Sequence, residues 1–137
     1  MRREVDWSAD VARFNRGFAQ AFGRKATLPP DKVRVFAARA TSGYPVDFLV
    51  GLPVAVRAAG LDKGRDVQPE FLLRDGSTSY SRNGERRQGF DWIGSLWQAA
   101  DRLSLTPAQA EILGDLGVLD WWTARGATVQ TPGGEEC

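Results

Sequence analysis

Residues 90–122 read FDWIGSLWQAADRLSLTPAQAEILGDLGVLDWW, and this stretch decides the fold that the sequence predicts. Its apolar residues recur at steps of three and four positions, which is the spacing of amphipathic helices and not the alternation of a strand. Thr106 is placed to cap a second helix, Pro107 suits its first turn because no N–H partner is needed there, and Gly117 is placed to end it. The stretch therefore predicts two helices joined by a short turn and closed by Trp121 and Trp122.

Upstream of this stretch the sequence predicts three more helical segments. They occupy residues 8–23, residues 30–40 and residues 46–59. Pro53 interrupts the third segment, because proline removes a hydrogen-bond donor and clashes with the preceding turn, so two short helices or one kinked helix are expected. The polar residues 74–89 show no periodicity. The expected fold class is therefore all-α, a small helical bundle of about five short helices with an irregular polar loop at residues 74–89.

Length and composition favour one domain of the ordinary globular kind. With 137 residues, of which 42% are hydrophobic and 26% charged, the chain can bury a core of its own. We expect residues 1–125 to form a single helical domain and residues 126–137, which include two consecutive glycines, to be a disordered tail. The one cysteine, Cys137, allows no intrachain disulfide, and no apolar run is long enough to span a bilayer. A cytoplasmic location is therefore expected.

The C-terminal half carries short motifs that resemble a known family. The motifs are Trp97, then Leu105-Thr106-Pro107-Ala108-Gln109, then Leu113 to Gly117 and a closing Trp121, preceded upstream by Ala59-Gly60, Val67-Gln68-Pro69 and Asp75-Gly76. In this order they resemble the helicase-associated domain, a small three-helix module found in tandem on some bacterial helicases. The resemblance covers mainly residues 59–122, and a fainter echo of its opening begins at Trp7 and continues through residues 22–29.

This resemblance implies both an organisation and a function. It implies that the chain holds degenerate tandem units at residues 7–45 and 53–122, that it acts in a bacterial cytoplasm, and that it binds nucleic acid. A helicase motor would then be on another chain or on a part that has been removed, because no Walker or Gly-x-Gly-x-x-Gly sequence is present here.

The inventory of reactive side chains argues against an enzyme. The chain has no histidine, which removes the commonest general base and the commonest metal ligand, and Cys137 lies in the expected tail. A zinc site is out of reach on the number of suitable ligands. Asp91 suits a helix start, and Asp115 and Asp120 have the simpler interpretation of solvated acids. We therefore expect no catalytic residue, no metal site and no cofactor.

The two halves of the chain differ in charge. Residues 1–65 hold 12 Lys/Arg and 6 Asp/Glu, a net charge of +6, whereas residues 66–137 hold 6 and 11, a net charge of −5. This asymmetry permits a basic face, although the pI of 7.9 is below the values above about 9 that are typical of dedicated nucleic-acid binders. The alternative is that these charges are ordinary solvated helix faces. The candidate phosphate-binding residues are Arg24, Lys25, Lys32, Arg34, Arg39, Arg82, Arg86 and Arg87.

Two functions follow from these features. The first is binding of DNA or another nucleic acid, in which the basic side chains contact phosphates and one exposed helix, from residues 93–103 or residues 30–40, enters a groove. The alternative is a non-enzymatic protein-interaction module, an inhibitor or adaptor, that uses the acidic, tryptophan-rich C-terminal half. Trp97 and Trp121 are expected in the core, whereas Trp122 must point another way and is the candidate for base stacking or partner contact.

Overall fold

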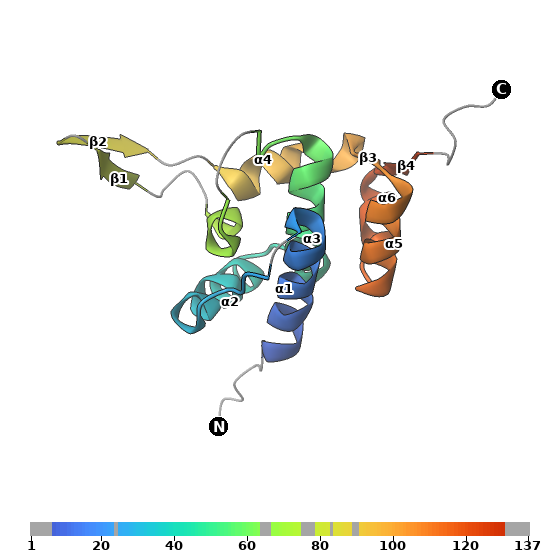
Figure 1. Cartoon of the computed structure of the whole chain (residues 1–137), viewed down its shortest axis with the longest axis horizontal. Coiled ribbons are helices and arrows are strands. Elements are labelled where there is room, and N and C mark those ends of the chain that lie inside the picture. The colour runs from blue at the N-terminus through green and yellow to red at the C-terminus, as the bar shows by residue number, and fades with distance from the viewer. Residues whose placement is uncertain are drawn as a thin grey trace.

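The computed structural model describes residues 7–23, 25–63, 67–74, 79–82, 84–88 and 91–130. In chain order the elements are α1 (Ser8–Phe22), the 3-10 helix η1 (Pro30–Lys32), α2 (Val33–Thr41), α3 (Val46–Ala59), the 3-10 helix η2 (Pro69–Leu73), β1 (Ser79–Arg82), β2 (Glu85–Gln88), α4 (Trp92–Ala99), the 3-10 helix η3 (Ala100–Arg102), β3 (Ser104–Leu105), α5 (Pro107–Asp115), α6 (Leu119–Arg125) and β4 (Thr128–Val129). Most of the described chain is helical, which confirms the predicted all-α bundle (Figure 1).

The helix at the centre of the bundle is α3. Its residues 48–56 are all buried. The contact between α1 and α3 is more extensive than that between any other two elements. On α1 the buried side chains are Val11, Phe14 and Phe18, which lie on the apolar stripe that the spacing predicts. One cluster of buried side chains runs from Val11 to Ala127, so the helices share a single hydrophobic core.

Of the two alternatives predicted for residues 46–59, the structure has a single helix, with Pro53 inside it. Pro53 is itself buried, as are its neighbours on both sides along α3. Most helical stability in proteins comes from tertiary packing and not from intrinsic propensity, and burial on every side of α3 offsets the hydrogen bond that Pro53 cannot donate.

The helical hairpin predicted from residues 90–122 is confirmed, together with its caps. The Asp91 side chain accepts a hydrogen bond from the Gly94 backbone N–H at 2.9 Å and so caps α4. At the start of α5 the Thr106 hydroxyl accepts from the Gln109 N–H at 3.1 Å, while the Gln109 side chain accepts from the Thr106 N–H at 2.9 Å. This reciprocal pair is a capping box, and Gly117, with φ +79°, follows the end of α5 as predicted.

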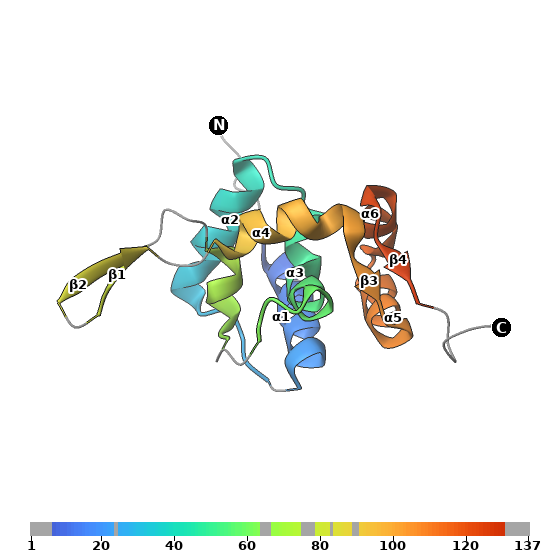
Figure 2. The ribbon, with the colours of Figure 1, turned by 90° about the horizontal axis from the view of Figure 1, so that it is seen from above.

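The prediction of an irregular loop at residues 74–89 is wrong for part of that range, because β1 and β2 form an antiparallel hairpin there. Ser79 pairs with Gln88 and Arg82 pairs with Glu85, and Gly84 occupies the turn with φ +79°. The hairpin projects from the bundle on the side of α2, away from α5 and α6 (Figures 1 and 2). Its extensive contacts are made between its own two strands. The strands read SYSR and ERRQ, so the sequence offers no alternation of apolar and polar residues that would have predicted them.

The expected disordered tail is also placed too early. Residues 126–130 are ordered against the bundle: the Thr128 N–H donates to the Leu103 carbonyl at 2.9 Å, and the Gln130 N–H donates to the Leu105 carbonyl at 2.7 Å. Ala127 is buried, and β4 pairs in parallel with β3. Backbone hydrogen bonds hold this segment, which is why side-chain periodicity gave no sign of it. The remainder of the predicted tail, residues 131–137, lies outside the described residues.

Candidate nucleic-acid interface

A groove between α2 and η2 brings together several of the predicted basic residues. The two helices lie side by side in both views (Figures 1 and 2). The groove has a volume of about 230 Å³ and is lined by Lys32, Val35, Arg39, Glu70 and Arg74. Three cationic side chains and one carboxylate give it a net charge of +2. A concave site with this charge attracts anions.

Arg39 and Arg74 are both held in place by the surrounding structure. The Arg39 Nε–H donates to the Leu73 carbonyl at 2.8 Å, and this bond joins α2 to the end of η2. The Arg74 guanidinium lies over the Phe71 ring, 4.1 Å from its centroid. Such stacking leaves the edge of a guanidinium available to a planar or tetrahedral anion. The backbone of Arg74 is also fixed, because its carbonyl accepts from the Ile93 N–H at 3.1 Å.

Three of the cations at or beside the groove have no acidic partner in the described part of the chain. Within the described residues, the side chains of Lys32, Arg34 and Arg74 form no ion pair and no hydrogen bond. The Glu70 carboxylate, on the same groove, also has neither kind of partner in that part of the chain. The ion pairs between described residues lie elsewhere, as between Arg57 and Asp62 at 2.8 Å. Lys32, Arg34 and Arg74 therefore have hydrogen-bond donors to offer to a ligand.

The structure gathers only part of the predicted basic set at this groove. Lys32 and Arg39 line it, and Arg34 is exposed on the same helix. Lys25 is exposed after the end of α1, where it shares a shallow surface depression with Arg16 instead. Arg24 lies outside the described residues.

The remaining predicted arginines belong to the hairpin. Arg82 ends β1, while Arg86 and Arg87 lie on β2 opposite Ser81 and Tyr80. The backbone of the hairpin lies on the α2 side of the bundle in both views (Figures 1 and 2). The structure therefore places the hairpin backbone and the groove at the same end of the molecule.

Two charged residues of the groove, Glu70 and Arg74, were missed by the sequence analysis. Arg74 directly follows the buried pair Leu72-Leu73, which the chain uses to anchor η2. A basic residue next to a short buried turn was the available signal, since the turn fixes the residue after it. Glu70 carried no such signal, because it is a groove residue only through the position of η2 beside α2.

The expectation that Trp122 is partly exposed is wrong. Trp122 is fully buried, and its indole Nε1–H donates to the Asp47 carbonyl at 3.2 Å. Its ring also lies 5.5 Å from the Phe48 ring. The reason is Gly51 on α3, which has no side chain and leaves the space that the Trp122 indole occupies. Trp122 is thus a core residue and not a stacking platform.

Trp97 and Trp121 are half-buried at the edge of the core. Their ring centroids are 6.2 Å apart, and the Arg125 guanidinium lies 4.3 Å from the Trp97 ring centroid and 5.6 Å from that of Trp121. These cation–π contacts cover part of the exposed indole surface. Within the described residues, the one large hydrophobic side chain with substantial exposure is Val129, at 45%.

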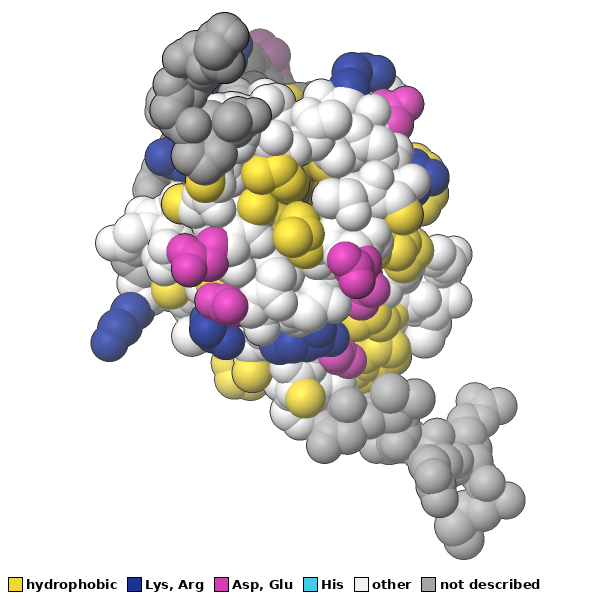
Figure 3. Space-filling view, turned by 90° about the vertical axis from the view of Figure 1, so that its right-hand side faces the viewer, with side chains coloured by type: hydrophobic (Ala, Val, Ile, Leu, Met, Phe, Trp, Pro, Cys, Tyr) yellow, Lys and Arg dark blue, Asp and Glu magenta, His cyan; other side chains and the backbone are white. Residues whose placement is uncertain are grey.

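The end of the molecule formed by α5 and α6 carries charges of both signs. Glu111, Asp115 and Asp120 are exposed there. Asp115 lies 3.9 Å from Arg16 of α1, and both side chains are more than half exposed. Figure 3 shows acidic, basic and hydrophobic side chains interspersed on this face. The surface is therefore not a uniform acidic patch.

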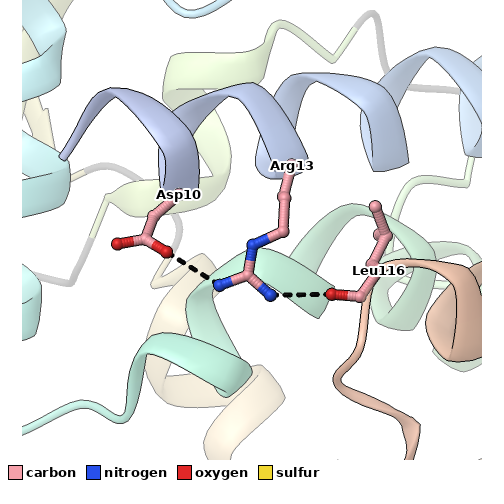
Figure 4. Close-up of polar contacts among 3 residues, drawn as sticks. All are labelled: Asp10, Arg13 and Leu116. Atoms are coloured by element: carbon pink, nitrogen blue, oxygen red, sulfur yellow. Dashed lines mark hydrogen bonds and ion pairs between the residues drawn. The ribbon is translucent and has the colours of Figure 1, made fainter.

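Arg13 joins this end to α1. Its Nη1 donates to the Leu116 carbonyl at 2.7 Å, and its Nη2 donates to the Asp10 carboxylate at 2.7 Å (Figure 4). Leu116 follows the last turn of α5, where helix carbonyls lack partners and a positive charge is stabilising. Arg13 is therefore a structural residue.

Other kinds of site find no support in the described part of the chain. It contains no group of three or more His, Cys, Asp or Glu side chains that would hold a metal ion. None of its helices has the length and apolar character required to cross a membrane. Comparisons with protein-family models, with curated proteins and with solved structures found no match.

Proposed function

We propose that this protein is a nucleic-acid-binding module that holds backbone phosphates at the groove between α2 and η2. The observation that carries the proposal is that two cations of the groove, Lys32 and Arg74, have no acidic partner in the described structure, and neither has Arg34, which is exposed on the same helix α2. Neutralising phosphates releases counterions from the nucleic acid, and this release supplies most of the sequence-independent affinity. The resemblance to the helicase-associated domain, with its link to DNA and to bacterial helicases, agrees with this function.

The distribution of elements supports the same proposal. The elements that form the groove, α2 and η2, and the backbone of the arginine-bearing hairpin occupy one end of the molecule (Figure 1). The exposed acids Glu111, Asp115 and Asp120 belong to α5 and α6 at the other end. A polyanion that approaches the α2 end therefore meets the basic groove first and stays away from those carboxylates.

Of the two helices expected to enter a groove of the nucleic acid, α2 is the better candidate. Phe36 is its one buried residue, and Arg34 is exposed on it. By contrast α4, from the predicted segment 93–103, buries Trp92, Ile93 and Leu96 in the core. A helix with its side chains is about 10–12 Å across, which matches a major groove about 12 Å wide. We propose that α2 lies against the phosphate backbone with one face toward the major groove of the nucleic acid.

A titration against single-stranded and double-stranded DNA at two salt concentrations tests the proposal. The double variant Lys32→Ala/Arg74→Ala removes two unpaired cations from the groove region. The matched control Lys25→Ala/Lys63→Ala removes two exposed cations that lie outside the groove and that likewise have no acidic partner in the described part of the chain. On duplex DNA we expect the groove variant to bind more weakly and to lower the slope of log K against log salt by about 1.8, since each phosphate contact contributes about 0.9.

The result that would contradict the proposal is equal weakening by both double variants, because binding would then depend on net charge and not on the groove. Failure of the unmodified protein to bind either DNA at low salt would contradict it as well.

The alternative of a protein-interaction module has weaker support. It requires an acidic and apolar surface on the C-terminal half, whereas acidic, basic and hydrophobic side chains are interspersed on the α5–α6 face (Figure 3). Trp122, the residue expected to contact a partner, is buried. A protein partner whose binding survives Lys32→Ala/Arg74→Ala would favour this alternative.

A further inference from the structure

The groove contains one side chain that a simple phosphate site does not explain. Glu70 lines it together with Lys32, Arg39 and Arg74. An ionised carboxylate accepts hydrogen bonds and donates none, and it repels a phosphate placed beside it. Within the described residues no cation pairs with Glu70 and no donor binds its oxygens. The carboxylate is therefore open to a hydrogen-bond donor on the ligand.

We infer that the groove recognises a ribose–phosphate unit, so that the protein prefers RNA to DNA of the same sequence. The inference rests on the proposed function and names the polymer that the same site selects. A ligand that suits the groove needs an anionic group for the cations and a neighbouring hydroxyl donor for Glu70. In RNA the 2′-hydroxyl is a donor that lies next to the 3′-phosphate on the same sugar. In DNA that hydroxyl is missing.

Both walls of the groove provide cations, and one of them also provides the carboxylate. Lys32 and Arg39 come from the η1–α2 side, and Glu70 and Arg74 come from η2 and the residue after it. Arg74 is held by Phe71, and Arg39 is held by the Leu73 carbonyl, so these two positive charges are fixed with respect to η2. With RNA, Glu70 gains a hydrogen bond that offsets its repulsion of the phosphate. With DNA, Glu70 loses contact with water and gains no partner, which weakens binding.

The size of the groove favours one unit of a polymer over a free small molecule. Its volume of about 230 Å³ is below the range of about 300–1,000 Å³ that is usual for pockets enclosing whole small ligands. A sugar–phosphate unit can occupy the groove while its bases stay outside. The contacts then depend on the sugar and phosphate and not on the base sequence.

The inference is tested by fluorescence anisotropy with three single-stranded oligonucleotides of one sequence built from A, C and G alone. They are RNA, DNA and 2′-O-methyl RNA, which keeps the 2′ oxygen but has lost the donor hydrogen. Single strands avoid the difference between A-form and B-form duplexes. We expect RNA to bind about tenfold more tightly than DNA, as one hydrogen bond to a charged group allows, and 2′-O-methyl RNA to resemble DNA.

The variant Glu70→Gln removes the negative charge while keeping the shape of the side chain. We expect it to strengthen DNA binding and to reduce the RNA-to-DNA ratio to about twofold or less. The control Glu111→Gln makes the same charge change on the exposed face of α5 and should leave the ratio unchanged. Thermal unfolding of both variants verifies that they are folded.

Three results would overturn the inference. Equal affinity of the unmodified protein for RNA and DNA, with both weakened by Lys32→Ala/Arg74→Ala, would remove the ribose preference and leave the proposed function intact. An RNA-to-DNA ratio that Glu70→Gln does not change would show that the preference arises elsewhere. Absence of binding to all three oligonucleotides at low salt would overturn the proposed function together with this inference.

Discussion

The contact between Trp122 and Gly51 attaches α6 to the central helix, and Gly51→Ala tests it. A β-carbon built at Gly51 would overlap the Trp122 Nε1 and would lie 2.8 Å from Cε2 of the same ring. The indole cannot move aside freely, because it is fully buried and its Nε1–H donates to the Asp47 carbonyl. The substitution therefore either pushes the indole out of its site or breaks that hydrogen bond.

The expected loss follows from three contributions. Overpacking a filled core costs about 1–3 kcal/mol. Leaving the buried indole N–H without a partner costs about 1–3 kcal/mol more if the ring shifts. Replacing glycine by alanine inside a helix returns about 1 kcal/mol through better helix propensity. We therefore expect Gly51→Ala to lower the free energy of unfolding by about 1–5 kcal/mol, measured by urea denaturation with tryptophan fluorescence.

Gly114 provides the matched control, because it is also a helical glycine but is exposed on α5. A β-carbon there would meet its nearest heavy atom, the Leu119 Cδ2, at 3.9 Å, an ordinary contact distance. Gly114→Ala should raise the free energy of unfolding by up to about 1 kcal/mol. Equal stabilisation by both substitutions would refute the placement of Trp122 against α3.

Three further predictions concern the caps, the α1–α5 contact and the hairpin. Thr106→Ala removes the capping box and should lower the unfolding free energy by about 1 kcal/mol in urea denaturation, and an unchanged value would contradict that cap. Arg13→Ala should lower the free energy of unfolding by about 1–2 kcal/mol, because the hydrogen bond to the Leu116 carbonyl is lost. Arg16→Ala should lower it by less than about 0.5 kcal/mol, because the ion pair with Asp115 is exposed. Equal losses of stability in thermal unfolding would contradict the contact between Arg13 and Leu116. Replacing residues 76–89 with a short Gly-Ser linker should change stability by less than about 1 kcal/mol, since the hairpin packs mainly on itself, but should weaken nucleic-acid binding measurably. If that variant is unfolded, the hairpin is needed for stability, and if its affinity is unchanged, the hairpin does not contribute to binding; either result would contradict this prediction.

The parts of the fold that sequence analysis predicted are those set by local chemistry. Thr106, Pro107 and Gly117 define the ends of α5 through hydrogen bonds and backbone preferences within a few residues. Pro53 was misleading because its local cost is offset by burial of α3, which no local pattern reveals. The hairpin was missed because its strands, SYSR and ERRQ, lack the apolar alternation by which a strand is predicted.

The candidate site was only partly predictable because it depends on contacts between distant residues. Arg39 meets the Leu73 carbonyl 34 positions later in the chain, and this contact forms the groove. Charge alone indicated Lys32 and Arg39 but could not indicate that Arg74 would join them. The local sequence also could not show which of Trp121 and Trp122 is fully buried. The space that the Trp122 indole occupies is left by Gly51, which lies on another helix.

The central claim is that nucleic acid binds at the groove between α2 and η2. The most direct test is an NMR titration of the ¹⁵N-labelled protein with a single-stranded oligonucleotide, following backbone amides and arginine Nε–H signals. We predict that the perturbed signals cluster at residues 32–39 and 69–74 and include the Nε–H of Arg74, while those of α5 and α6 stay in place. Perturbations centred on α5 and α6, or none at low salt, would contradict the account.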